Sequence, residues 1–288
     1  MVMLKRRNIR ETAIQFLYFA DLEDGPEASE MQDVFWEMTQ ESSLKKLSQA
    51  KAKAILHVAQ GRDNRITKLA ERAPAIQAQL KATDGTAPLI DALKKILTQE
   101  KKLSNTVEAL RTATQTKNGD PLPDEKLDDV IQSNRSLISL RKIWHQTLED
   151  FPTWKNKVES ITAAINHLQR VSERLEAIED PESSVGDFAH LHASSAEISI
   201  FRKETQSLVQ NILNYKAAID ESLAKVIENY APERVDPVDR AIMRLATYEI
   251  KHDDDIPRAV SINEAIEIAK KFGTTESARF INGVLDAI

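Results

Sequence analysis

The chain has 288 residues, of which 41% are hydrophobic, and carries a net charge of −6. Its length suffices for about two domains with a buried core, and the absence of cysteine excludes disulfides, thiolate metal sites and a cysteine nucleophile. Glycine is scarce, with 7 residues, whereas Leu, Ala, Glu, Lys and Gln are plentiful, which predicts an all-α fold. The negative charge argues against a general nucleic-acid coating protein, so any RNA binding must come from a local patch.

The N-terminal segment predicts an amphipathic helix from Lys5 to Tyr18, because apolar residues recur there at intervals of three and four. Arg6, Arg7 and Arg10 cluster around its first turn, where the helix dipole favours acidic residues instead. The cluster therefore points to an external anionic partner. The alternative is that the arginines only solvate the start of the helix.

The same segment superficially resembles a signal peptide, since basic residues precede apolar ones. Polar residues at Glu11, Thr12 and Gln15 interrupt the apolar run and argue against that interpretation. No other stretch approaches the uncharged apolar length that crosses a bilayer. We therefore expect a cytoplasmic protein with no membrane partner.

Residues 43–195 differ in composition from both flanks and are interrupted at 82–88, 119–124 and 180–186. Apolar residues follow alternating spacings of three and four over 89–110, broken at Glu100, and over 151–178, broken near Ser172. These rows predict two helices that pack antiparallel through heptad-like seams. We therefore expect a core formed by 1–42 and 196–288, interrupted by a helical hairpin or small bundle at 43–195.

Charge is unevenly distributed within this insertion. Residues 43–102 contain 13 Lys or Arg and 5 Asp or Glu, whereas residues 103–195 contain 10 and 15, respectively. One interpretation is that the basic half contacts RNA. The other, which the usual behaviour of charged helix faces favours, is that the two halves attract each other across a solvated seam.

The C-terminal part predicts four helices. The first spans 196–231 and ends at Pro232, and the second begins at Pro237 with Asp236 as its cap. A loop is expected at 253–255. The third helix shows capping-box spacing between Ser261 and Glu264 and ends at Gly273, where a left-handed residue is expected. The fourth begins near Thr275.

The sequence lacks the usual signatures of catalysis. Neither a glycine-rich phosphate loop nor a glycine-flanked serine elbow is present. The histidine pair His190 and His192 has no downstream acidic ligand at metal spacing, and the aspartates at 253–255 lack the spaced oxygen ligands of a calcium loop. We expect no cofactor, no metal and no enzymatic activity.

Two blocks resemble the NusB family of transcription antitermination factors: KRRNIRETAIQFLYFADLE at 5–23, and VDPVDRAIMRLATYEI with IPRAVSINEAIEIAKKFGTTESARFINGVLDAI within 235–288. The resemblance covers residues 1–42 and 196–288, and residues 43–195 have no counterpart in the usual short members. It implies a helical bundle that binds boxA-type single-stranded RNA together with the small-subunit ribosomal protein NusE. It also implies a role in ribosomal RNA transcription and processing, and contact with the RNA polymerase elongation complex through other Nus factors.

The resemblance implies two RNA-binding elements. Such sites hold single-stranded RNA with cations along the phosphates and with planar side chains that stack on bases. One element is the basic N-terminal segment, Lys5, Arg6, Arg7 and Arg10. The other is the turn and helix start around Gly273, with Lys271, Thr275, Glu276, Ser277, Arg279 and Phe280.

The resemblance further implies that Tyr18 and Asp239 contact the protein partner. Three of the implied residues also have structural interpretations. Phe280 is of a type that usually packs in the core, Tyr18 would serve as a half-buried amphipathic ring, and Asp239 is an acid favoured by the helix dipole.

Two other functions compete with antitermination. The chain could be a detached NusB-like domain of the kind fused to ribosomal RNA cytosine methyltransferases, although no glycine-rich segment is available to bind S-adenosylmethionine. Alternatively, the insertion at 43–195 could be the working part of a helical adaptor or a coiled-coil dimer.

Overall fold

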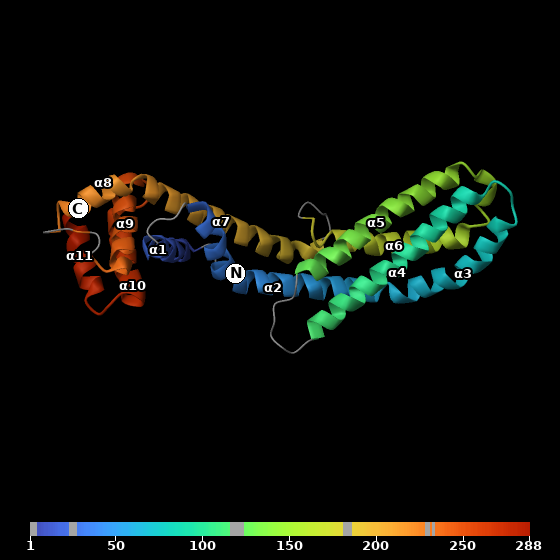
Figure 1. Cartoon of the computed structure of the whole chain (residues 1–288), viewed down its shortest axis with the longest axis horizontal. Coiled ribbons are helices and arrows are strands. Elements are labelled where there is room, and N and C mark those ends of the chain that lie inside the picture. The colour runs from blue at the N-terminus through green and yellow to red at the C-terminus, as the bar shows by residue number, and fades with distance from the viewer. Residues whose placement is uncertain (1–4, 23–27, 116–123, 181–185, 228–230, 232–233) are drawn as a thin grey trace. The chain divides into compact units, whose positions relative to one another are not determined.

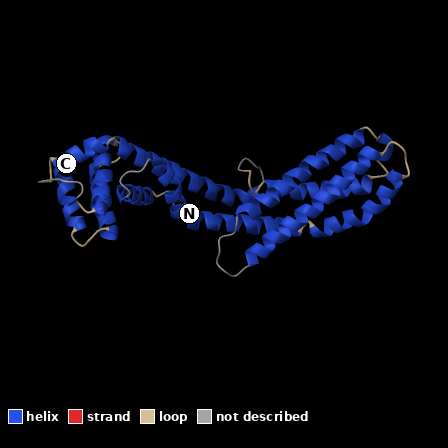
Figure 2. Ribbon diagram, in the orientation of Figure 1, coloured by secondary structure: helices blue, strands red, loops and turns tan. Residues whose placement is uncertain are grey.

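The computed structural model describes residues 5–22, 28–115, 124–180, 186–227, 231 and 234–288. Within these ranges every regular element is a helix, and Figure 2 shows helices joined by loops without a strand. The all-α fold predicted from composition is confirmed. Contacts divide the chain into two compact units: unit 1 comprises residues 1–42 and 196–288, and unit 2 comprises residues 43–195.

Unit 1 is organised around one central helix, α9 (Pro237–His252), whose residues 239–249 are all buried. This helix contacts α1, α8, α10 and α11, and Figure 1 shows α9 and α10 lying between α1 and α11. The surrounding helices are α1 (Arg6–Leu22), α8 (Lys216–Ala224), α10 (Arg258–Phe272) and α11 (Ser277–Ala287), together with the first part of α2 (Ala28–Gln60) and the last part of α7 (Ala189–Asn214).

Aromatic side chains join three of these helices. The ring centroids of Phe16 and Phe35 lie 5.1 Å apart, those of Phe35 and Trp36 lie 5.4 Å apart, and those of Trp36 and Phe201 lie 6.5 Å apart. All three pairs are edge to face, and each contributes about 0.5–1.5 kcal/mol beyond the burial of its area. This row fixes α1, α2 and α7 together inside unit 1.

Helix α9 begins where the sequence predicts it. Oδ1 of Asp236 accepts hydrogen bonds from the backbone amides of Val238, at 2.8 Å, and Asp239, at 3.4 Å. Pro237 occupies the first turn, where its missing amide hydrogen costs nothing. The predicted cap and start are confirmed, as is the loop at 253–255 that follows the helix.

The single helix predicted over 196–231 is wrong. The structure instead has α7, which ends at Asn214, and α8, which begins at Lys216. The break at Tyr215 contains neither glycine nor proline. The Tyr215 ring stacks on His252 of α9 with centroids 4.1 Å apart, and both side-chain oxygens of Asp220 accept hydrogen bonds from Arg244 of α9 at 2.8 Å. These contacts with α9 thus determine where α7 ends and in which direction α8 runs. The predicted stop at Pro232 lies outside the described residues.

The predicted end of α10 before Gly273 is confirmed, but the predicted capping box and left-handed glycine are wrong. The helix begins at Arg258 with Pro257 as its cap, so Ser261 lies inside the helix and Glu264 pairs with Arg7 instead of capping. Gly273 has φ −89° and ψ −171°, which is extended and not left-handed. A Cβ atom at Gly273 would lie 2.6 Å from Cβ of Ser277, so the glycine is needed for a close approach.

Unit 2 contains a bundle of four long helices, α3 (Asp63–Lys81), α4 (Ala87–Gln115), α5 (Asp124–Glu149) and α6 (Glu159–Glu176), which run alongside one another in Figure 1. Two short 3-10 helices, Pro152–Trp154 and Gly186–Phe188, complete its connections. The loop predicted near 82–88 is present between α3 and α4. Residues 119–123 and 181–185 of the other two predicted interruptions lie outside the described ranges.

The seam predicted between residues 89–110 and 151–178 does not pair those two segments directly. Helix α4 packs mainly against α5 and α3, and α6 packs against α3 and α5. The apolar rows of α4 and α6 instead face a shared core, to which α4 contributes Leu89, Leu93 and Ile96, and α6 contributes Ile161, Ile165 and Leu168.

The two polar residues that break these rows meet the same arginine. Glu100, 1% exposed, accepts hydrogen bonds from Arg62 on one carboxylate oxygen and from Arg141 on the other. Arg141 also donates to Oγ of Ser172 at 2.7 Å. A buried network of charges and hydrogen bonds therefore crosses the bundle at the positions where its apolar rows are interrupted.

Candidate nucleic-acid interface

The basic residues predicted at the start of α1 fall into two groups. Lys5, Arg6 and Arg7 are exposed, whereas Arg10 is buried. Lys5 and Arg6 form no ion pair with any residue that the structure describes. They are the cations of this segment that can meet a phosphate without first breaking an internal contact.

Arg7 is exposed but already held from one side. Its Nε and Nη2 atoms donate to the two carboxylate oxygens of Glu264 at 2.7 and 2.6 Å, and its side chain is 49% exposed. These hydrogen bonds raise the pKa of Arg7 and lower the pKa of Glu264. Because a guanidinium has five N–H donors, Arg7 keeps donors for a second acceptor while Glu264 fixes its orientation.

Arg10 is buried and links two helices of unit 1. Its Nε atom donates to Oε1 of Glu249 at 2.7 Å, and the two side chains are 5% and 2% exposed. Its Nη1 atom also lies 3.9 Å from the carboxylate of Glu264. The structure therefore places Arg10 as a link between α1 and α9 and separates it from the exposed cations.

The second predicted element begins beside α1. Nζ of Lys271, at the end of α10, lies 2.7 Å from Oε2 of Glu11 on α1, with more than half of the lysine side chain exposed. Glu11 and Glu264 thus join α1 to α10 at two points. As a result, Lys271 lies on the same side of unit 1 as the basic residues of the first element.

The rest of the second element lies on α11 and the turn before it. Thr275, Glu276, Arg279 and Phe280 are exposed, and Phe280 is 40% exposed, so the alternative that it packs in the core is wrong. A groove with a volume of about 550 Å³ passes this face. Its lining combines an aromatic ring, one cation, one acid and apolar positions, namely Phe280, Arg279, Glu276, Gly283, Val284, Val226 and Ile227.

Ser277 donates a hydrogen bond to Asp239 in the interior, whereas Oδ1 of Asp239 has no hydrogen-bond partner among the described residues. Ser277 is 1% exposed, and its hydroxyl donates to Oδ2 of Asp239 at 2.9 Å while accepting from the amide of Thr274 at the same distance. Burial raises the pKa of Asp239. The pair ties the start of α11 to α9, so neither side chain faces a partner directly. Tyr18 is half-buried on α1.

The acids that organise these cations were not predicted from the sequence. Glu11, Glu249 and Glu264 hold Lys271, Arg10 and Arg7, respectively. Each acid lies on an amphipathic helix far along the chain from its partner, so helical periodicity alone does not pair them. Among the described residues, no group of three or more His, Asp or Glu is arranged to hold a metal ion, and no helix is long and apolar enough to cross a membrane.

Comparison with known proteins matches the C-terminal part of this chain to one family. The model of the NusB family matches residues 159–288. The chain is 38% identical over 107 residues to transcription antitermination protein NusB of Pseudothermotoga lettingae, an alignment that covers 37% of this chain and 74% of that protein. It is 47% identical over 87 residues to the protein of that name from Trichlorobacter lovleyi, covering 30% of this chain and 61% of the relative.

A third relative, transcription antitermination protein NusB of Bacillus cereus, is 52% identical over 83 residues, or 29% of this chain and 64% of the relative. The chain belongs to the NusB family. The family match begins at the first residue of α6, inside unit 2, and continues through α11. The N-terminal block at 5–23 lies outside the matched residues.

Proposed function

We propose that this protein is a transcription antitermination factor that binds boxA-type single-stranded RNA together with the ribosomal protein NusE. In this proposal it acts in ribosomal RNA transcription and processing and reaches the RNA polymerase elongation complex through other Nus factors. Its membership of a family whose relatives are named transcription antitermination proteins supports the general role. The observation that carries the RNA-binding part is the exposed ring of Phe280 beside Arg279 on a groove.

The chemistry of the two elements suits an unpaired strand. Proteins hold single-stranded nucleic acid by stacking bases on aromatic rings and by following the backbone with cations. Phe280 offers a ring face, and Lys5, Arg6 and Arg7 offer positive charge. Glu276 would repel a phosphate but can accept a hydrogen bond from a base edge. We propose that Thr275 and Lys271 flank this path, while Arg10 and Ser277 hold it in place.

We propose that NusE contacts the half-exposed Tyr18 on α1. Asp239 is buried against Ser277, so we propose that it acts on partner binding by fixing the start of α11. We further propose that residues 43–195 are an insertion into a core formed by 1–42 and 196–288, and that the protein works in the cytoplasm without a cofactor or catalytic activity of its own.

Replacing Phe280 with alanine tests the stacking role. Stacking of a base on an aromatic side chain is worth about 1–3 kcal/mol, so we expect the affinity for a boxA-like oligonucleotide, measured by fluorescence anisotropy, to fall by roughly five- to 150-fold. Val260→Ala is the control, because Val260 is an apolar side chain of similar exposure, 43%, outside the groove. Both variants are first checked by thermal unfolding. Equal affinity for the wild-type and Phe280→Ala proteins would remove stacking from the proposal.

A further inference from the structure

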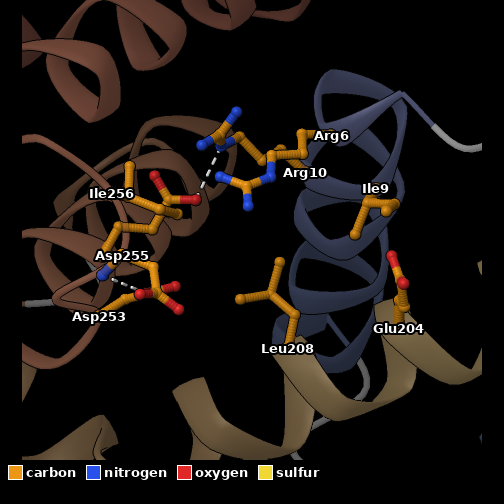
Figure 3. A pocket seen from close by; sticks show the side chains of 9 residues that line it. Arg6, Ile9, Arg10, Glu204, Leu208, Asp253, Asp255 and Ile256 are labelled. Carbon is orange, nitrogen blue, oxygen red and sulfur yellow. Dashed lines mark hydrogen bonds and ion pairs between the residues drawn. The ribbon is translucent and has the colours of Figure 1, made fainter.

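A cavity with a volume of about 180 Å³ lies beside Arg6 in unit 1. Its walls come from α1, α7, α9 and the loop after α9, and Figure 3 shows the cavity from close by. Three aliphatic side chains line it, namely Ile9, Leu208 and Ile256. A water molecule occupies about 30 Å³ in the liquid, so the cavity has room for a group several times that size.

Acidic groups predominate around this cavity. Four carboxylates line it, those of Glu204, Glu249, Asp253 and Asp255, against the two guanidinium groups of Arg6 and Arg10. Arg10 and Glu249 form an ion pair and so neutralise each other. The remaining lining has three acids and the single cation Arg6. A phosphate would be repelled here, whereas a cation would be attracted.

One of these acids, Glu249, has a buried carboxylate oxygen without a hydrogen-bond partner among the described residues. The side chain of Glu249 is 2% exposed, and Arg10 occupies its Oε1 atom. Its Oε2 atom is buried and has no hydrogen-bond partner among the residues that the structure describes. A buried acceptor without a partner costs about 1–3 kcal/mol, or more when charged. Glu249 lines the cavity, so a donor that enters it and reaches Oε2 would gain a hydrogen bond that the described residues leave unmade.

We propose that this cavity binds the side chain of an arginine presented by a protein partner. An arginine lays its methylene stem along apolar walls while its charged head seeks polar groups, which matches the aliphatic lining and the acids. Its planar head carries five donors and is less strongly hydrated than an ammonium group, so it can meet Glu249 and the acids of the 253–255 loop together at a lower desolvation cost than lysine. This inference is independent of RNA binding by the second element.

Methyl NMR of the full chain, labelled on Ile and Leu, tests this assignment. The probe is the blocked tripeptide Ala-Arg-Ala, and the control probe carries citrulline, which keeps the shape and lacks the charge. We expect the arginine peptide to shift the methyl signals of Ile9, Leu208 and Ile256, and the citrulline peptide to leave them unchanged.

Variants of the loop make the test specific. Asp255→Asn removes an acid that lines the cavity, and Asp254→Asn removes its exposed neighbour, which does not. We expect Asp255→Asn to weaken binding of the arginine peptide by about two- to fivefold, the range of an exposed ion pair, and Asp254→Asn to have less effect. Arg6→Ala should strengthen binding because it removes a like charge, and it also shows whether Arg6 itself competes for the cavity.

Three outcomes would overturn the assignment. Equal shifts with citrulline would show that charge is not recognised, and equal weakening by both loop variants would show that the effect is a general one of net charge. If a single-stranded RNA oligonucleotide moved all three methyl signals and the arginine peptide moved none, the cavity would be a base-binding site instead.

Discussion

Arg10 of α1 and Glu249 of α9 form an ion pair in the interior of unit 1, with 2.7 Å between Nε and Oε1. Removing one partner of a buried pair leaves the other charge uncompensated and costs about 3–5 kcal/mol. We therefore expect Arg10→Ala to lower the free energy of unfolding by about that amount, measured by denaturant titration. Arg6→Ala, an exposed control on the same turn, should stay within about 0.5 kcal/mol of the wild type.

If Arg10→Ala and Arg6→Ala unfolded at the same denaturant concentration, Arg10 would not have the structural role assigned to it. The distinction also bears on RNA binding. A variant that replaces all three arginines would lose affinity through unfolding as well as through lost phosphate contacts, so tests of RNA binding need to leave Arg10 in place.

Two glycines of unit 1 should respond in opposite ways to alanine. Gly273→Ala would bring a Cβ to 2.6 Å from Cβ of Ser277 and 2.9 Å from the carbonyl oxygen of Ala269, so we expect destabilisation by about 1–3 kcal/mol. Gly283 lies within α11 with nothing in reach of an added Cβ. Gly283→Ala should stabilise by about 0.5–1 kcal/mol, because alanine favours the helix. Urea unfolding distinguishes the two, and a stable Gly273→Ala would refute the close approach.

Arg7 should support the fold in a pH-dependent way. Its hydrogen bonds depress the pKa of Glu264 below the ordinary value of 4.5. A carboxylate with a depressed pKa stabilises the fold above its ordinary pKa, and this contribution is lost as the pH falls through the folded value. We expect Arg7→Ala to be less stable than the wild type at pH 7, with the difference shrinking below pH 4.5. A difference that is constant from pH 7 to pH 3 would contradict this linkage.

Glu100 should matter more to unit 2 than any exposed acid on the same helix. It is the single carboxylate between Arg62 and Arg141, and all three side chains are at most 3% exposed. Glu100→Gln leaves two buried guanidinium groups without a counter-charge, so we expect a loss of about 3–5 kcal/mol. Glu108→Gln, which removes an exposed acid paired with Arg111, should cost less than about 1 kcal/mol. Thermal unfolding of both variants checks the contrast.

Local signals in the sequence predicted the start of α9 but not the cap of α10, where Glu264 pairs with Arg7 of another helix. Asp236 and Pro237 fixed the start of α9 because a cap and its helix are adjacent in the chain. The break at Tyr215 escaped prediction because contacts with His252 and Arg244 of another helix produce it. The burial of Arg10 was not predicted for the same reason, because its partner Glu249 lies 239 residues further along the chain. Periodicity identifies the inward face of a helix but not which charged side chain meets which.

The most direct test of the proposed function is the binding of a boxA-like RNA oligonucleotide across salt concentrations, with and without NusE, to the wild-type chain and to the Arg6→Ala, Arg7→Ala double variant. The control is Arg111→Ala, Arg174→Ala, which removes one half-buried and one exposed arginine of unit 2. We predict that the wild type prefers the boxA-like sequence over a scrambled one and that NusE strengthens binding. The double variant should bind more weakly, with a salt slope shallower by about 1.4. Equal, weak binding of both sequences by all three proteins would contradict the antitermination role.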